Sequence, residues 1–580
     1  MEEIKSLLVA AGLLALCSIF LIRAHQKRKA NRPYIYHQLY GPLFFLSVLT
    51  PFVMQFALAR KNITLPDVLL MALTIPLYLQ LVIALVMVLR LLFNNHDYQD
   101  PELVELKKYP KVAIILPTYH EPFEIAKMTL DSLIAMEYEG DWKIIVVDNS
   151  RDFEDLESWR SYVTHLNELF QGSNLEVEWI SRDPELKGFK PLNLDVAYER
   201  YVANDWEVEY VMYADTDSTF HVNTLTDLVK TFAADEDAAY IQLMTVANNM
   251  EVNRLSKAVG MQQTIFRYIL GEIGNWGMPI FYGHNAIYKR AVIAQLGSFL
   301  EKDSRGEFML TEDFSMTIRA YLQGSYGKTH WILSGEGVPT SLAALKGMWD
   351  RWAVGGLQVL FKYFKRVVVS NKINFYEKVS FLYHGLSYPS NALIPVFILL
   401  SPMISSVALI AFVLLLLFGS ISAIGFRKKF GMLIEETRTN PSSFVDYYCS
   451  FFAVHSYIFW VMFLSTWKFI YQMIVPRKYR EKLSWVVTPK GKEEKMKWST
   501  VLRNNVSILV FVGTFFAISG YFLWNSYAGM NDFLILLPGG FFCFNLLLTL
   551  LVFGRSRKTS SKPSVKSPEP FQSGEMLVDP

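Results

Sequence analysis

The sequence has few cysteines and almost no net charge. Its three cysteines, Cys17, Cys449 and Cys543, lie in apolar stretches without the spacing of a metal site. No disulfide framework is visible, and we expect these residues to behave as small buried hydrophobes. The 56 Lys and Arg residues nearly balance the 54 Asp and Glu residues, which leaves a net charge of +2. Charge therefore gives no reason to expect a nucleic acid as a partner.

Apolar residues, in contrast, are abundant. At 580 residues the chain is too long for one core, and with 52% hydrophobic and 15% aromatic residues it is too apolar for a wholly soluble protein. This composition predicts that part of the chain lies in a lipid bilayer.

Residues 1–95 are predicted to form about three transmembrane helices. The apolar run 7–22 is followed, not preceded, by a basic cluster, and it lacks small residues at a cleavage site. This order favours an uncleaved anchor with its C-terminal end in the cytoplasm over a cleaved signal peptide. Two further spans fit residues 41–59 and 67–93.

Residues 96–345 have the pattern of a soluble α/β domain. Short β-rich runs alternate with helix-like segments there, which predicts a largely parallel sheet. The β-rich runs are KVAIILP (111–117), WKIIVVD (142–148), EVEWIS (176–181), VEYVMYAD (208–215) and AAYIQLM (238–244).

Apolar segments resume after this domain. The first, 388–425, contains Pro395 and Pro402, so one long kinked span and a tight hairpin both fit it, and the chain has seven or eight spans in all. We divide the rest of the chain into amphipathic interface helices (346–386), transmembrane helices (387–474), a cytoplasmic segment (475–502), two C-terminal transmembrane helices (503–554) and a disordered cytoplasmic tail (555–580).

Polar residues follow three of the predicted strands, at 118–121, 148–150 and 215–217. In open α/β sheets ligands bind outside the carboxyl ends of the strands. Taken singly, each group also fits an ordinary turn or helix cap. Asp215 and Asp217 are like charges one residue apart, so they either face water at a turn or share a cation.

Six motifs, in their order along the chain, resemble those of the family 2 glycosyltransferases, and in particular the processive membrane-embedded synthases typified by cellulose synthase. The motifs are PTYHE (117–121), DNS (148–150), KPLN (190–193), DTD (215–217), TED (311–313) and RW (351–352). The resemblance implies a nucleotide-sugar-binding domain of the GT-A type at 96–345, inserted in a polytopic α-helical membrane domain.

The resemblance also implies a donor site for a UDP-sugar. Asp148 would accept a hydrogen bond from the uracil base, and Asp215 and Asp217 would hold Mg²⁺ or Mn²⁺, which carboxylates and phosphate oxygens bind well. The donor-binding residues implied are Thr118, Tyr119, Glu121, Asp148, Lys190, Asp215, Arg351, Thr488 and Lys490.

The TED motif at Thr311, Glu312 and Asp313 has two interpretations. Apolar residues recur at helical spacing after Asp313, so Thr311 fits the N-cap of a helix with the two acids in its first turn. By resemblance, the motif is catalytic and Asp313 is the general base that removes a proton from the acceptor hydroxyl. The transfer would be inverting, and an α-linked donor would give a β-linked product.

The acceptor site is implied at Gly283, His284 and Trp352. Gly283 would allow close backbone approach, and Trp352 offers a flat face for a sugar ring. A structural histidine at 284 and an interfacial amphipathic helix at the Arg-Trp pair fit these residues as well. Met348 stands where long-polymer synthases of the family carry a glutamine, which leaves the product length open.

The segment LSWVVTPKGKEEK (483–495) resembles the gating loop of cellulose synthases, with Thr488 and Lys490 as donors to the diphosphate. A basic juxtamembrane loop attracted to anionic lipid also fits it. As a gating loop it would share the cytoplasmic side with Asp215.

The sequence thus predicts a hexosyltransferase of the cell membrane, multi-pass, with a cytoplasmic catalytic domain. It would polymerise a UDP-sugar, by preference UDP-glucose into a β-glucan, and pass the growing polysaccharide across the bilayer. An accessory periplasmic or extracellular export subunit is compatible with this, and no nucleic-acid partner is expected.

Three alternatives remain open at this stage. The first is a nonprocessive membrane transferase that acts on a lipid carrier, and the second is a polymer synthase of the hyaluronan or N-acetylglucosamine type. The third is a noncatalytic sensor or scaffold, which would not need the intact acids Asp215, Asp217 and Asp313. The linkage and the oligomeric state do not follow from the sequence.

Overall fold

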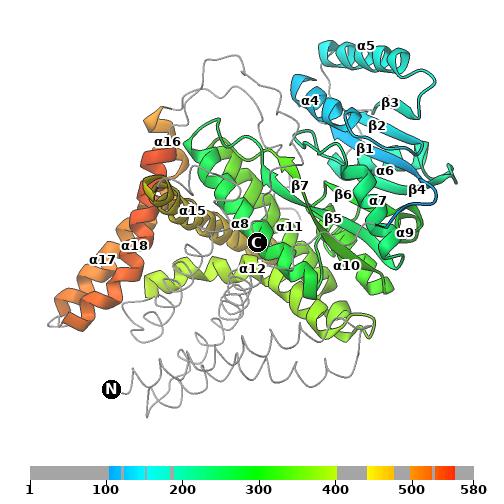
Figure 1. Ribbon diagram of the computed structural model, residues 1–580. Coiled ribbons are helices and arrows are strands. Elements are labelled where there is room, and N and C mark those ends of the chain that lie inside the picture. The colour runs from blue at the N-terminus through cyan, green and yellow to red at the C-terminus, as the bar shows by residue number, and fades with distance from the viewer. Residues whose placement is uncertain are drawn as a thin grey trace. The chain divides into compact units, whose positions relative to one another are not determined.

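The computed structural model divides the chain into two compact units (Figure 1). We call them the sheet unit, whose described residues lie between 104 and 373, and the helical unit, whose described residues lie between 374 and 554. The described residues are 104–118, 123–149, 153–182, 188–400, 441–475, 497–525 and 530–554. The predicted spans at 7–22, 41–59 and 67–93, the gating-loop segment 483–495 and the tail 555–580 lie outside them.

The sheet unit is built on a seven-stranded sheet with the order β3-β2-β1-β4-β6-β5-β7. Only β6 runs antiparallel to its neighbours, so the prediction of a mostly parallel sheet is confirmed. The strands are β1 (Lys111–Thr118), β2 (Trp142–Asp148), β3 (Leu175–Ser181), β4 (Val208–Tyr213), β5 (Ala238–Ala247), β6 (Ala286–Lys289) and β7 (Tyr326–Glu336).

The five apolar runs of the sequence form β1 to β5, whereas β6 and β7 were not predicted. β6 is only four residues long, and β7 contains the polar stretch Lys328 to His330. Both take strand conformation because they pair with β5, one along each of its edges. The tertiary partner, not the local pattern, therefore decides their structure.

Helices cover both faces of this sheet, which explains why its central strands are apolar throughout (Figure 1). One face forms the main core with α4, α5 and α7, where Ile114 of β1 and Ile144 of β2 are fully buried. The helices of the unit are α4 (Phe123–Ile134), α5 (Phe153–Leu169), α6 (Phe189–Tyr201), α7 (Thr224–Ala234), α8 (Arg254–Trp276), α9 (Arg290–Leu296), α10 (Glu312–Gln323) and α11 (Leu342–Val369).

The helical unit contains, in its described part, α12 (Phe375–Leu400), α15 (Pro441–Ile474), α16 (Trp498–Asn504), α17 (Val506–Asn525) and α18 (Met530–Phe553). α15 packs against α12 and α18. Pro389 and Pro395 lie inside α12. Residues 401–440 are outside the described part, so the choice between one kinked span and a hairpin at 388–425 stays a prediction.

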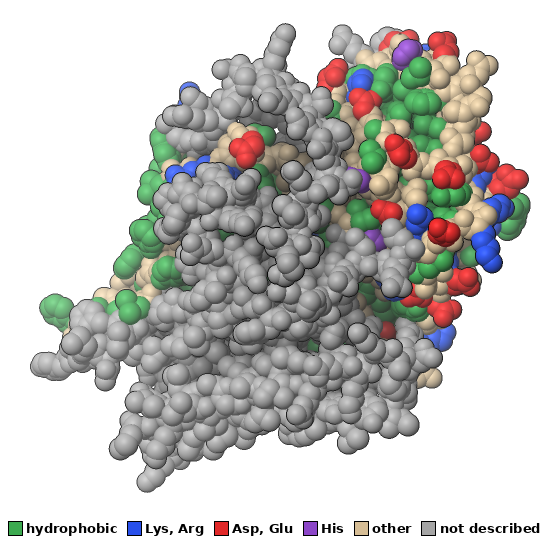
Figure 2. Space-filling model, in the orientation of Figure 1, with side chains coloured by type: hydrophobic (Ala, Val, Ile, Leu, Met, Phe, Trp, Pro, Cys, Tyr) green, Lys and Arg blue, Asp and Glu red, His purple; other side chains and the backbone are tan. Residues whose placement is uncertain are grey.

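One helix in the described part is long and apolar enough to cross a membrane, at Val506–Trp524 with a mean hydropathy of 2.1. Gly539–Phe553 is a shorter apolar helix. Large apolar side chains of α17, among them Val510 and Trp524, are exposed, and hydrophobic side chains are visible on the surface where α17 lies (Figure 2). The expectation of a membrane protein is thus supported by one candidate span, and the multi-pass arrangement stays a prediction.

The end of β7 lies so close to Thr219, after β4, that a side chain at Gly335 would displace it. Gly335 pairs with Thr219 in an antiparallel bridge, and a Cβ at Gly335 would lie 1.9 Å from the Thr219 hydroxyl. We expect Gly335→Ala to lower the free energy of unfolding by about 1 to 3 kcal/mol, because the bridge must shift. Gly347→Ala is the control, since nothing lies within 4 Å of a Cβ there. Thermal unfolding that shows equal losses for both variants would contradict the prediction.

Candidate active site

The carboxyl ends of β1, β2 and β3 meet at one edge of the sheet because the strands are parallel and in register. Thr118 is paired with Asp148, and Asp148 with Ser181. The Thr118 hydroxyl donates to Asp148 Oδ1 at 2.6 Å, and the Asp148 carbonyl accepts from the backbone N–H of Arg182 at 2.7 Å. Asp148 is fully buried. A buried carboxylate at this edge can recognise a donor group such as the N–H of a nucleobase.

Two further residues complete this corner. Arg182 donates from Nε to Asn193 Oδ1 at 2.5 Å, and Asn193 donates to the Thr118 carbonyl at 3.3 Å. Neither residue was identified as a site residue, although Asn193 ends the KPLN motif. Arg182 directly follows β3. A polar residue after the strand, the pattern seen after β1, β2 and β4, could therefore have identified it.

The DTD motif forms the turn after β4. Ser218 donates its backbone N–H to the Asp215 carbonyl at 3.0 Å, and its hydroxyl accepts from the backbone N–H of Asp215 at 3.3 Å. Lys190, on α6, lies 3.3 Å from Asp215 Oδ2. The structure thus contains the polar turn that the sequence offered as one alternative, and it places Lys190 beside Asp215. The cation shared by Asp215 and Asp217 stays a prediction.

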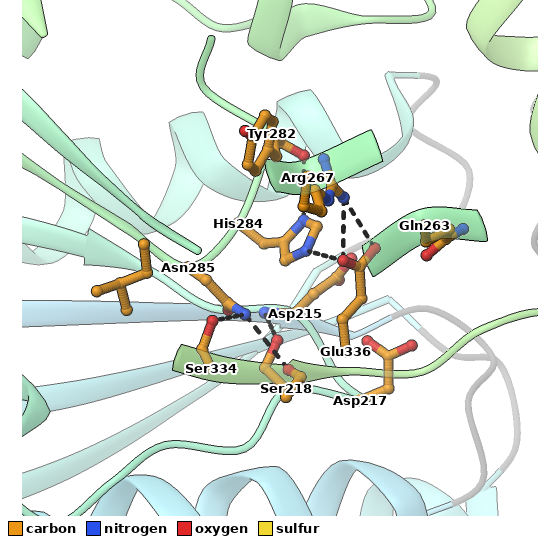
Figure 3. A network of polar contacts seen from close by, with 12 residues as sticks. Asp215, Asp217, Ser218, Gln263, Arg267, Tyr282, His284, Asn285, Ser334 and Glu336 are labelled. Carbon is orange, nitrogen blue, oxygen red and sulfur yellow. Dashed lines mark hydrogen bonds and ion pairs between the residues drawn. The ribbon is translucent and has the colours of Figure 1, made fainter. Parts of the chain in front are cut away.

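Asp217 is held by the neighbouring strands. Its backbone carbonyl accepts from Asn248 Nδ2 at 2.8 Å. Gly337, just after β7, lies so close that a Cβ there would be 2.6 Å from Asp217 Oδ2. The two acids are labelled in Figure 3, which shows them beside the end of β7.

The DTD turn fits a divalent cation that binds together with a diphosphate. Asp215 and Asp217 supply two carboxylates, and no group of three or more His, Cys, Asp or Glu side chains suited to a metal ion occurs among the described residues. Mg²⁺ is usually held by one or two carboxylates, with substrate phosphates and water as its other ligands. The two carboxylates therefore suit a cation whose remaining ligands come from the substrate and water.

The TED motif begins α10, as the helical spacing predicted, with both acids in the first turn. Thr311 occupies the N-cap position without a side-chain capping hydrogen bond. Its side chain instead packs against Gly355 of α11, where a Cβ would lie 2.5 Å from Thr311 Cγ2. The N-terminus of α10 thus packs against α11.

Asp313 lies against the backbone of Gly283. The Asp313 Oδ1 atom accepts from the N–H of Phe314 at 2.7 Å, and a Cβ at Gly283 would be 3.2 Å from Oδ2. Gly283 has a φ of 86°, a left-handed conformation that other residues rarely adopt. The backbone of Gly283 thus lies close to Asp313. Its role at the acceptor stays a prediction.

Five charged groups influence one another at this edge. Burial raises the pKa of Glu312 to about 7, with a further increase from Asp313, and burial also raises the pKa of Asp313. Burial alone would lower the pKa of Lys190, but Asp215, Glu312 and Asp313 raise it above its usual value. Burial lowers the pKa of Arg351 despite the same three carboxylates.

Arg351 and Trp352 lie on α11, where Trp352 makes an edge contact with Trp349 at 5.1 Å between ring centroids. Met348 is buried one turn earlier and accepts from Gln263 Nε2 at 3.6 Å. His284 is buried with Nδ1 3.1 Å from the Tyr282 carbonyl. Tyr119, Glu121, Thr488 and Lys490 lie outside the described residues, so their predicted roles stay predictions.

Comparisons with known proteins agree with this chemistry. Residues 210–424 match the family model described as Glycosyl transferase family group 2. That range begins in β4 and includes Asp215, Asp313 and Arg351. The match agrees with the expectation of a family 2 glycosyltransferase domain in this part of the chain.

Among curated proteins, the chain is similar to the probable glucomannan 4-beta-mannosyltransferase 6 of Oryza sativa subsp. japonica. The two are 23% identical over 296 residues, which is 49% of this chain and 49% of the rice protein. The chain thus spans about half the length of the curated relative it matches.

Among solved structures, the mannosyltransferase PcManGT from Pyrobaculum calidifontis, in complex with GDP-Man and Mn²⁺, is 16% identical and has a TM-score of 0.43 over 68% of this chain and 97% of that one. S. aureus TarS 1-349 is 15% identical, with a TM-score of 0.29 over 59% and 90%. These scores are too low to support inferences about this chain.

Gly283 and Gly297 provide a matched pair for testing the contact with Asp313. Both have a positive φ, 86° and 73°, but nothing lies within 4 Å of a Cβ at Gly297. We expect Gly283→Ala to lower kcat by about 100-fold because the base is displaced, whereas Gly297→Ala changes stability only. Steady-state kinetics on both purified variants decide this, and equal effects on kcat would refute it.

The raised pKa of Glu312 predicts that the stability of the protein depends on pH. Folding raises this pKa from 4.5 to about 7, so the folded state retains a proton that the unfolded state loses, and stability falls as the pH rises through this window. Glu312→Gln removes that loss. Its Tm relative to wild type should therefore be higher at about pH 8 than at about pH 5. A Tm difference that stays constant or shrinks with increasing pH would disprove the raised pKa.

Proposed function

Because the chain contains a family 2 glycosyltransferase domain, we propose that it transfers a hexosyl group from a nucleotide-sugar donor to a carbohydrate acceptor with inversion. The observation that carries the proposal is that Lys190 of α6 lies 3.3 Å from Asp215 Oδ2 in the turn after β4, with Asp313 of α10 near enough to raise the pKa of Lys190 as well. Nucleotide ligands of open α/β sheets bind at this edge.

The donor side of the site has a place for each part of the nucleotide. The Asp148 carboxylate, aligned by Thr118, accepts from the base. Lys190 and Arg351 balance the charge of the diphosphate. A divalent cation, Mg²⁺ or Mn²⁺, at Asp215 and Asp217 would neutralise the negative charge that develops on the leaving diphosphate. Tyr119, Glu121, Thr488 and Lys490 are proposed to complete the donor site.

The transfer is a single displacement. Asp313 takes the proton from the acceptor hydroxyl, the oxygen of that hydroxyl forms a bond to the anomeric carbon, and the bond from this carbon to the diphosphate oxygen breaks. Attack from the side opposite the leaving group inverts the anomeric centre. Gly283 fixes Asp313 from one side, and Trp352 offers the acceptor ring an apolar face.

The donor sugar has two candidates. UDP-glucose is favoured by the likeness of the segment 483–495 to a glucan synthase gating loop, whereas a mannosyl donor is favoured by the name of the rice relative. We propose that the enzyme acts processively at the cytoplasmic face and passes the product through its own helices. The candidate span at Val506–Trp524 and the exposed apolar residues of α17 support a membrane location.

The test is transfer of label from four donors. Membranes that contain the protein are incubated with labelled UDP-glucose, UDP-N-acetylglucosamine, UDP-glucuronate or GDP-mannose, with Mg²⁺ or Mn²⁺. We expect one donor to label a high-mass, lipid-free product. Asp313→Asn should lower kcat by about 100- to 10,000-fold while donor binding persists, because only the base is lost.

Asp215→Asn should abolish both cation-dependent donor binding and transfer. Asp141→Asn is the matched control, because Asp141 is an exposed acid before β2, at the opposite edge of the sheet. Label confined to lipid would replace the polymer synthase by the nonprocessive alternative. No transfer from any donor, or full activity of Asp215→Asn, would refute the proposed function.

A further inference from the structure

A buried ion pair lies behind the acceptor side of the site. Arg267, on α8, contacts both carboxylate oxygens of Glu336, the last residue of β7, at 3.2 and 3.0 Å (Figure 3). The two side chains are only 8% and 12% exposed. Neither residue belongs to the motifs by which the sequence resembles the family, and the reaction proposed above does not use them.

Stability alone does not account for this pair. Removing two charges from water is costly, and a buried ion pair is often no more stable than apolar residues of the same size. Burial alone would raise the pKa of Glu336 and lower that of Arg267. Facing each other, the two groups reverse both effects, with His284 contributing to the low pKa of Glu336. Both therefore stay charged inside the protein.

The pair contacts the residues on either side of Gly283. The Arg267 guanidinium lies 3.9 Å from the centroid of the Tyr282 ring. Glu336 Oε2 lies 3.6 Å from His284 Nε2, and the other ring nitrogen of His284 faces the Tyr282 carbonyl. The segment that places Gly283 against Asp313 is thus held at both ends by one ion pair.

The side chain of Gln242 supports the same segment from β5. Its Oε1 accepts from the backbone N–H of Tyr282 at 2.9 Å, and its Nε2 donates to the carbonyls of His284 at 3.1 Å and Asn285 at 3.0 Å. Asn285 has a φ of 51° and donates to the Ser334 hydroxyl at 2.9 Å. A backbone in two left-handed conformations needs such support to persist.

Glu336 also connects this segment to the DTD turn. Its carbonyl accepts from the N–H of Asn248 at 3.0 Å, and the Asn248 side chain donates to the Asp217 carbonyl. The next residue, Gly337, contacts the Asp217 carboxylate. The end of β7 is thus connected to the segment beside Asp313 through the Glu336 side chain, and to the DTD turn through Asn248.

We propose that Arg267 and Glu336 are a positioning pair, which holds Tyr282, Gly283 and His284 against Asp313 and so places the acceptor hydroxyl at the base. The inference rests on the proposed transferase function. Because the two side chains act on this segment, their loss affects turnover and acceptor KM. The link from Glu336 to the DTD turn runs through its backbone carbonyl, which side-chain replacement retains, so donor KM should not change.

The test compares single and double replacement of the pair. Arg267→Met and Glu336→Gln each leave one buried charge without its partner and should lower Tm. The double variant, Arg267→Met with Glu336→Gln, is neutral and should regain most of the Tm. We expect its kcat to stay about 100-fold below wild type, with a raised acceptor KM and an unchanged donor KM. Arg267→Lys keeps the charge and should recover part of kcat.

Lys143 and Asp205 provide a matched control pair. They lie 2.6 Å apart with side chains 9% and 19% exposed, and Lys143 is near the start of β2, away from the site. Neutralising both, with Lys143→Met and Asp205→Asn, should change Tm without lowering kcat.

Three results would overturn the positioning role. In the first, the neutral double variant regains kcat together with Tm, which means that the pair is only structural. In the second, donor KM rises in proportion to the loss of kcat, which means that the pair supports the whole site. In the third, kcat is unchanged in every variant. An inactive wild type in all four donor assays is a separate result, which refutes the proposed function and this inference with it.

Discussion

Charge compensation at the carboxyl edge of the sheet is the constraint on which the site depends. Asp215, Glu312 and Asp313 would repel one another in a partly desolvated space if Lys190 and Arg351 were absent. The compensation is incomplete, because burial still raises the pKa values of Glu312 and Asp313. An additional cation beside Asp215 and Asp217 would lower the cost of ionising both groups, which connects donor binding to the state of the base.

Asp313, the proposed base, is connected to Arg351 through contacts with α11. Gln358 of this helix donates to Asp303 Oδ2 at 3.0 Å and accepts from the backbone N–H of Leu310 at 3.0 Å. Thr311 packs against Gly355 in the next turn back. The loop that leads into the TED motif is therefore bound to the helix that carries Arg351 and Trp352. In the proposed reaction, Arg351 would contact the diphosphate and Asp313 the acceptor, and these hydrogen bonds would keep the two at a fixed separation.

The sequence was informative where local pattern determines structure. Apolar runs located β1 to β5, and the polar residues after them located Asp148 and Asp215, because parallel strands bring their carboxyl ends to one edge. It failed where distant pairing decides. β6 and β7 form by pairing with β5, and Arg267 meets Glu336 across 69 residues of chain only because of this pairing. Thr311 occupies the N-cap position that its sequence context suggested, but its side chain packs against Gly355 of α11 and makes no capping hydrogen bond.

Met348, which replaces the glutamine of the related synthases, bears on how the proposed donor site would bind the diphosphate. Its sulfur is buried and accepts from the Gln263 amide, so this position offers the diphosphate no hydrogen-bond donor. On α11, the charge for the diphosphate then comes from Arg351, in a setting where burial lowers its pKa. A guanidinium remains protonated there because its pKa begins far above neutral. In the proposed function, recognition of the diphosphate would therefore depend on Lys190 of α6 and Arg351 of α11, and donor affinity would depend on how these two helices are placed.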